Sequence, residues 1–134
     1  MPFLWRRTPK IVSLDPDIRA VCEYRAAECQ VRLSGRITID SSPNLRALLL
    51  QRLESPTCQI LTVDFCEIAY IDTSGLAILV EILKAARTQG KTFNLSGLQE
   101  RPRFLLEATR LLHLFHEVNH ETPDVNHSGP ESLQ

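Results

Sequence analysis

One segment limits the possible folds more than any other. An apolar run at residues 59–65 (QILTVDF) is followed, after a short connection, by an apolar segment with helical spacing at residues 74–89. The run contains the β-branched Ile60 and Val63 and is typical of a central strand that is covered on both faces. Gly90 follows the helical segment as a natural C-cap. A buried strand that leads directly into a helix predicts a layered α/β domain.

The flanking segments supply further strands and helices. Residues 18–24 and 29–34 alternate between apolar and polar side chains, which predicts two strands joined by a four-residue hairpin loop, and Gly35 ends or bulges the second strand. Ser41 or Ser42 offers an N-cap and Pro43 a first helical position for a helix that ends near residues 55–56. These elements predict a single α/β domain whose mixed sheet has about four to five strands packed against helices.

The two ends of the chain differ in composition from the middle. Residues 1–16 carry three prolines and predict a flexible arm with one short strand at residues 11–14. Residues 119–134 are polar, with two prolines and a glycine, and predict a disordered tail. The domain is therefore expected at residues 17–118. It should end in a strand at 92–95, a helix at 101–109, and either a helical turn or an edge strand within 111–118.

Charge and composition exclude several functional classes. Fifteen Lys and Arg residues against sixteen Asp and Glu give a net charge of −1, and aromatic residues make up 6% of the chain. Both values argue against nucleic-acid binding, which needs phosphate neutralisation and base stacking. The longest strongly apolar run, residues 76–83, is interrupted by Glu81 and is far shorter than the roughly 20 residues of a membrane span. We expect a cytoplasmic protein with no direct membrane insertion, with its four cysteines as buried thiols.

The chemistry of the chain is concentrated in Asp72-Thr73-Ser74-Gly75, where the predicted strand meets the predicted helix. Thr73 and Ser74 should lie at the helix N-terminus, where free backbone N–H groups and the helix dipole favour negative charge. Asp72 or Thr73 would cap the helix. A hydroxyl at this position is also well placed to accept a phosphate.

Four segments, in the same order along the chain, resemble the STAS domain, the fold of bacterial anti-sigma factor antagonists. They are VRLSG at 31–35, PNLR at 43–46, the strand and Asp-Thr-Ser-Gly-Leu signature within 60–79, and AARTQGK at 85–91. The resemblance implies that Thr73 accepts a phosphoryl group from a serine/threonine kinase that is also an anti-sigma factor. Ser74 would be the fallback acceptor, with Asp72 and Gly75 supporting the site.

The resemblance also implies how such a protein would switch partners. The unphosphorylated form binds the kinase and frees the sigma factor, and phosphorylation abolishes that binding. A phosphate adds about −1.5 to −2 charges at pH 7. Placed beside Asp72 in a partly apolar docking surface, it would have to be desolvated next to a like charge.

Two departures from the family pattern leave an alternative open. The family commonly has acidic residues after the second strand, whereas this chain has GRIT at residues 35–38, and its acceptor is a threonine where simple antagonists have a serine. The signature also resembles the STAS subunit of the bacterial phospholipid-transport ABC complex. In that case the chain would be an accessory subunit that regulates an ABC-type lipid transporter through its ATPase, and Thr73 would support docking without phosphorylation.

The second predicted helix has a wide apolar arc. The face expected to pack on the sheet is centred on four residues: Leu76, Leu79, Val80 and Leu83. The arc is extended by three further residues that we interpret as a partner-binding surface: Ile78, Ile82 and Ala85.

Other functional classes have little support in the sequence. Ile71-Asp72-Thr73 is similar to the Asp-Thr-Gly of aspartic proteases, but Ser74 replaces the glycine, and we predict no enzymatic activity. No phosphate-binding glycine loop is present, and we expect no cofactor. His113, His116 and His120 could bind a metal on a continuous helix, but we expect them in a terminal segment without fixed geometry.

Overall fold

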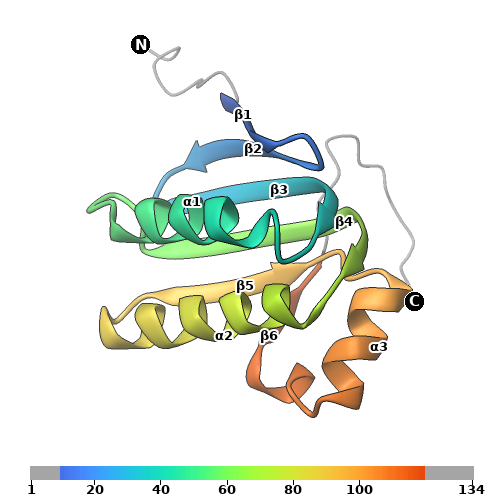
Figure 1. Ribbon diagram of the computed structural model, residues 1–134. Coiled ribbons are helices and arrows are strands. Elements are labelled where there is room, and N and C mark those ends of the chain that lie inside the picture. The colour runs from blue at the N-terminus through green and yellow to red at the C-terminus, as the bar shows by residue number, and fades with distance from the viewer. Residues whose placement is uncertain (1–9, 120–134) are drawn as a thin grey trace, which may run out of the picture.

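The computed structural model describes residues 10–119, which form one mixed sheet with helices (Figure 1). The sheet contains six strands in the order β1-β2-β3-β4-β5-β6. The first three pair antiparallel: β1 (Lys10–Asp15), β2 (Ile18–Arg25) and β3 (Glu28–Ile37). The others continue from β3 in parallel: β4 (Ile60–Ile71), β5 (Thr92–Ser96) and β6 (His116–Val118). The predicted α/β class and mixed sheet are confirmed.

The sheet has more strands than expected because both ends of the domain contribute one. The strand expected at residues 11–14 is β1, which pairs with β2, so part of the predicted N-terminal arm belongs to the sheet. A helical turn or an edge strand was expected within residues 111–118, and the segment contains both: a short 3₁₀ helix (Leu112–Leu114) and the edge strand β6. The rest of the predicted arm, residues 1–9, and nearly all of the predicted tail, residues 120–134, lie outside the described residues.

The expectation of a connection after residue 65 is wrong, because β4 continues to Ile71. It remains paired with β3 through two register shifts, one between Arg32 and Ser34 and one between Gly35 and Arg36. Gly35 has φ +115°, and a Cβ there would collide with the carbonyl oxygen of Asp17. A residue with a side chain would be strained here, so Gly35 bulges the strand instead of ending it.

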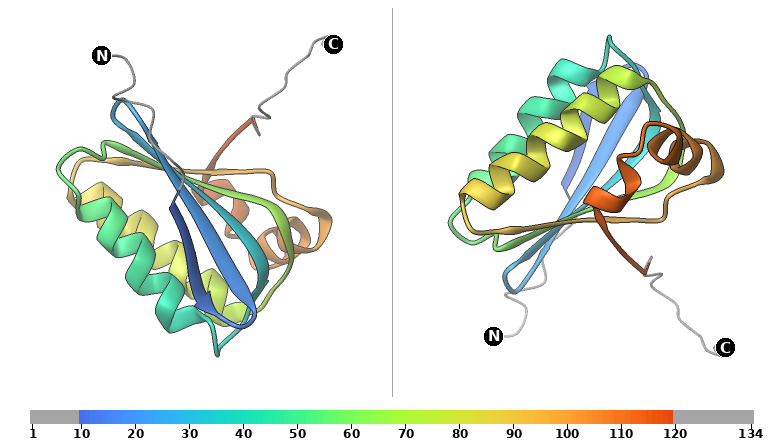
Figure 2. Two further views of the ribbon diagram at one scale, coloured as in Figure 1. Left: turned by 90° about the horizontal axis from the view of Figure 1, so that it is seen from above. Right: turned by 90° about the horizontal axis from the view of Figure 1, so that it is seen from below.

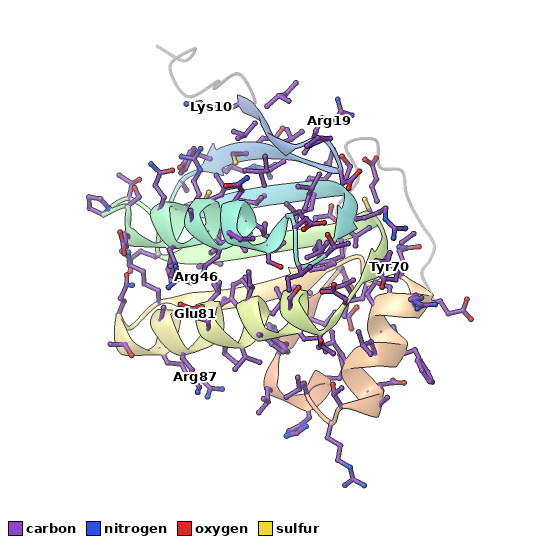
Figure 3. All side chains as sticks on the ribbon, in the orientation of Figure 1. Lys10, Arg19, Arg46, Tyr70, Glu81 and Arg87 are labelled. Carbon is purple, nitrogen blue, oxygen red and sulfur yellow. The ribbon has the colours of Figure 1, made fainter. Side chains whose placement is uncertain are left out.

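Two long helices lie side by side on one face of the sheet (Figure 2), α1 (Ser42–Glu54) and α2 (Thr73–Thr88). The Arg46 guanidinium of α1 makes a bidentate ion pair with Glu81 of α2, with its shortest N–O distance at 2.6 Å (Figure 3). The third helix, α3 (Glu100–Ala108), contacts β4 near the end of the sheet. No helix within residues 10–119 is long and apolar enough to cross a membrane.

The strand directions bring three connections to one edge. β3, β4 and β5 run parallel, and each is followed by a connection that leads to a helix. Their carboxyl ends therefore meet at the same edge of the sheet, the usual position of functional sites in open α/β sheets. The Asp72-Thr73-Ser74-Gly75 segment lies at this edge, beside the loop that joins β3 to α1.

Candidate functional site at the start of α2

Asp72 is the N-cap of α2 and holds the start of the helix in place. Its carboxylate accepts hydrogen bonds from the backbone N–H groups of Ser74 (3.0 Å) and Gly75 (3.3 Å). The other carboxylate oxygen accepts the backbone N–H of Ile39, in the loop after β3, at 3.1 Å. One side chain therefore accepts two backbone N–H groups of the first turn that have no partner within the helix. It also connects the helix to the neighbouring loop.

The Asp72 carboxyl is ionised at neutral pH. Burial by itself raises the pKa of this group, but the hydrogen bonds from the Ser74 hydroxyl and from the Gly75, Ser74 and Ile39 amides outweigh it and hold the pKa below its ordinary value. A full negative charge is thus fixed directly beside Thr73.

Ser74 is engaged on both sides of its hydroxyl. Its Oγ donates to the Asp72 carboxylate at 2.5 Å and lies 2.8 Å from the hydroxyl oxygen of Ser42, the first residue of α1. The Ser42 hydroxyl also lies 2.7 Å from the carbonyl oxygen of Thr38, and because the Ser74 proton goes to Asp72, the single Ser42 proton is shared between the Thr38 carbonyl and the Ser74 oxygen. Ser74 is also partly buried, so its hydroxyl is less accessible to another protein than the hydroxyl of an exposed residue.

Thr73 is the first residue of α2, and its environment is the opposite of that of Ser74. The side chain is exposed, and its hydroxyl makes no hydrogen bond with any residue between 10 and 119. Of the two capping candidates, Asp72 alone caps the helix, which leaves the Thr73 hydroxyl accessible from solvent.

Gly75 lets the helix start approach the sheet closely. A Cβ at this position would lie 2.6 Å from the Ile37 Cγ2 atom and 2.6 Å from the Ile71 Cγ1 atom. Both isoleucines are buried in the core at the ends of β3 and β4. The absence of a Cβ therefore lets the start of α2 pack closely against the ends of β3 and β4.

Comparison with known proteins identifies the family of this domain. The family model described as "Mlab, STAS domain" matches residues 23–116. The chain belongs to the STAS domain family. Curated relatives include an anti-sigma-B factor antagonist from Staphylococcus aureus, 30% identical over 69% of this chain and 84% of the relative. Another, from Bacillus subtilis, is 31% identical over 63% of this chain and 75% of the relative.

Solved structures show the same fold. An anti-sigma factor antagonist from Mycobacterium paratuberculosis superposes with a TM-score of 0.67 at 22% identity, covering 77% of this chain and 87% of that one. The phosphorylated form of the Bacillus cell fate determinant SpoIIAA gives a TM-score of 0.59 at 13% identity, with coverage of 74% and 90%. At these identities the likeness concerns the fold alone.

The prediction of a partner-binding surface on α2 of this STAS domain is wrong for two of its three residues. Ile78 is 5% exposed and Ile82 is 0% exposed, and both belong to the core cluster. The apolar arc of α2 is wide because the helix packs against α1 as well as against the sheet. Ala85 is partly exposed. The exposed residues of α2 near Thr73 are few, and Ala77 is one of them.

The remaining sequence candidates lie apart from this site. His113 lies in the 3₁₀ helix and His116 in β6, so they do not share a helix, and His120 is outside the described residues. Within residues 10–119, no group of three His, Cys, Asp or Glu side chains could hold a metal. The prediction of buried thiols is confirmed for three cysteines but not for Cys66, which is partly exposed. Burial raises the pKa of Cys29 to about 12.

Sequence reasoning missed two members of the site, Ile39 and Ser42. Ser42 was a candidate N-cap for α1, but its hydroxyl instead links α1 to Ser74. Ile39 contributes its backbone N–H to Asp72, and its side chain is 69% exposed beside the site. No local pattern signals either contact, because each spans more than thirty residues of sequence.

Proposed function

We propose that this STAS protein is a regulator of the anti-sigma factor antagonist type, a binding protein without enzymatic activity that acts in the cytoplasm. It would bind an anti-sigma factor with kinase activity, and phosphorylation of Thr73 by that kinase would release it. The observation that carries this proposal is the contrast between two adjacent hydroxyls: Thr73 is exposed and free of hydrogen bonds to the described residues, whereas Ser74 is bound to Asp72 and Ser42. The names of the curated relatives support the class of partner.

Electrostatics support phosphorylation as the event that would change binding. The Ser74 and Gly75 amides, which would otherwise attract a phosphate to the helix N-terminus, already donate to Asp72. A phosphate on Thr73 would therefore remain on the solvent side, next to an ionised carboxylate. A partner that covers Thr73 would have to bury both charges, which is strongly unfavourable without cationic groups facing them.

The test is intact-mass analysis of the purified protein after incubation with ATP and an anti-sigma factor kinase from the same genome. We expect one added phosphate in the wild type and in Ser74→Ala, and none in Thr73→Ala. Phosphate addition that persists in Thr73→Ala, or is absent from the wild type after incubation with each such kinase of the genome, would contradict the proposal.

Binding measurements complete the test. Thr73→Ala should keep the affinity for the kinase, because the hydroxyl makes no structural hydrogen bond, whereas Thr73→Glu should weaken it by about tenfold or more through like-charge burial beside Asp72. If Thr73→Ala alone weakened binding, and the partner recovered were the ATPase of an ABC transporter, the hydroxyl would be a contact and not a switch.

A further inference from the structure

Two arginines from different elements stack on one tyrosine close to the Thr73 edge of the sheet. The guanidinium carbon of Arg36, on β3, lies 4.4 Å from the centroid of the Tyr70 ring, and that of Arg101, in the first turn of α3, lies 5.3 Å from it. Arg36 and Tyr70 are register partners on adjacent strands, and Tyr70 precedes Thr73 by three residues. The ring holds both cations in one small area of the surface.

Neither arginine of this pair forms a salt bridge with a carboxylate side chain that the structure describes. Both Arg36 and Arg101 are exposed. Arg103, on the same helix, does have a carboxylate partner: its guanidinium makes a bidentate ion pair with Glu117, with N–O distances of 2.9 and 2.6 Å. Since two like charges held together repel each other, an additional anion at the Arg36–Tyr70–Arg101 cluster would be favourable.

An apolar groove lies directly next to this cluster. It has a volume of about 410 Å³ and is lined by Glu100, Arg101, Phe104 and Leu105. The Phe104 side chain is 65% exposed, although a ring of this size is normally covered. Arg101 therefore belongs both to the cationic cluster and to the groove, and the two form one continuous surface.

We propose that the Arg36–Tyr70–Arg101 cluster and the groove beside Phe104 form a docking site for a protein segment that carries a carboxylate next to an apolar side chain. Guanidinium groups bind carboxylates through two parallel hydrogen bonds, and arginine and tyrosine are enriched among the residues that dominate binding energy at interfaces. The carboxylate would lie between the two guanidinium groups, and the apolar side chain would cover the Phe104 ring. This site is separate from the Thr73 hydroxyl and does not depend on its phosphorylation.

The experiment is an NMR titration of the ¹⁵N-labelled full chain with a capped LEELLEE peptide, which observes the side-chain Nε–Hε resonances of arginine. We expect saturable shifts at Arg36 and Arg101 and at the backbone of Phe104. The neutral LQQLLQQ peptide should give no saturable shift. Raised salt should weaken the binding, because exposed charges are screened over about 10 Å at 0.1 M ionic strength.

Variants separate this site from a general effect of charge. The double variant Arg36→Gln/Arg101→Gln should lower the affinity for LEELLEE about tenfold, and Phe104→Ala should lower it without any change of charge. Arg87→Gln is the matched control, an exposed arginine at the far end of α2 (Figure 3), and should leave the affinity within about twofold. Glu100→Gln should tighten binding, because it removes a like charge from the groove.

Three results would overturn the proposal. One is an equal affinity of LEELLEE and LQQLLQQ. Another is an equal loss of affinity in Arg87→Gln and in the double variant. The third is the same shifts with inorganic phosphate at the same concentration and no effect of Phe104→Ala, which would indicate an anion site without an apolar contact.

Discussion

Replacement of Asp72 by alanine should destabilise the fold, although the side chain is only partly buried. The variant loses the N-cap of α2 and the hydrogen bond from the Ile39 amide, and it leaves the Ser74 hydroxyl without its acceptor. An N-cap contributes about 1 kcal/mol to stability. The link to the loop after β3 adds about 1 kcal/mol, the net value of a typical hydrogen bond that water can partly replace. We therefore expect a loss of about 2 kcal/mol in the free energy of unfolding.

The matched control is Asp40→Ala, which removes the same charge from the same edge. Asp40 is exposed in the loop that follows β3, and its carboxylate accepts no hydrogen bond from residues 10–119. Its replacement should change stability by less than about 0.5 kcal/mol. Urea unfolding at pH 7, followed by circular dichroism, measures both variants against the wild type.

The pH dependence gives an independent check of the same reasoning. Because the pKa of Asp72 is lower in the folded protein than its ordinary value, the ionised carboxylate contributes stability above about pH 4, and that contribution is lost as the pH falls through the lowered pKa. The difference between wild type and Asp72→Ala should therefore shrink in acid. A difference at pH 7 no larger than that of Asp40→Ala, or one that grows in acid, would refute this account of the cap.

Three further predictions concern packing and surface charge. Gly75→Ala should cost about 1–3 kcal/mol in urea unfolding, because its Cβ would overlap two buried isoleucines, and an unchanged midpoint would contradict the close packing. Ile82→Asp should abolish cooperative thermal unfolding, whereas Ala85→Asp should stay folded, since only Ile82 is fully buried. Arg46→Gln should cause a small loss of stability that vanishes in about 1 M NaCl, because its ion pair with Glu81 is exposed, and a loss that is independent of salt would contradict this.

The parts of the site that the sequence predicts are the local ones. Asp72 could be predicted as a cap because a cap acts on amides two and three residues ahead, within the same motif. The contacts of Asp72 with Ile39 and of Ser74 with Ser42 could not be predicted. They depend on the parallel pairing of β3 with β4, in which Ile37 lies opposite Ile71, and such a register is not encoded within a short window of sequence.

The errors of the sequence analysis have the same physical origin. The apolar run that predicts β4 ends at Phe65, before Cys66 and Glu67, so the sequence predicts the end of the strand there. The strand nevertheless continues, because a bulge absorbs the extra residue while pairing with β3 resumes at Ser34. In the same way, the helical spacing of α2 predicts which side of the helix is apolar. It does not predict how much of that side is buried by other elements of the fold. A helix packed against both a sheet and a neighbouring helix buries more of its circumference than one that only lies on a sheet, and this places Ile78 and Ile82 in the core.

The rigidity of the α2 start bears on how phosphorylation would act. Ser42, Ser74, Asp72 and the Ile39 amide form one continuous chain of hydrogen bonds that fixes the beginnings of both long helices to the loop after β3. Thr73 lies within this segment but contributes no side-chain bond to it. A phosphate on Thr73 would therefore break none of these bonds, and we expect it to change the charge of the surface and not its shape. A partner would then distinguish the two forms by charge, through the cost of desolvating the phosphate and through its repulsion by Asp72. Because salt screens the repulsion but not the desolvation, part of the loss of affinity on phosphorylation should decrease as ionic strength rises.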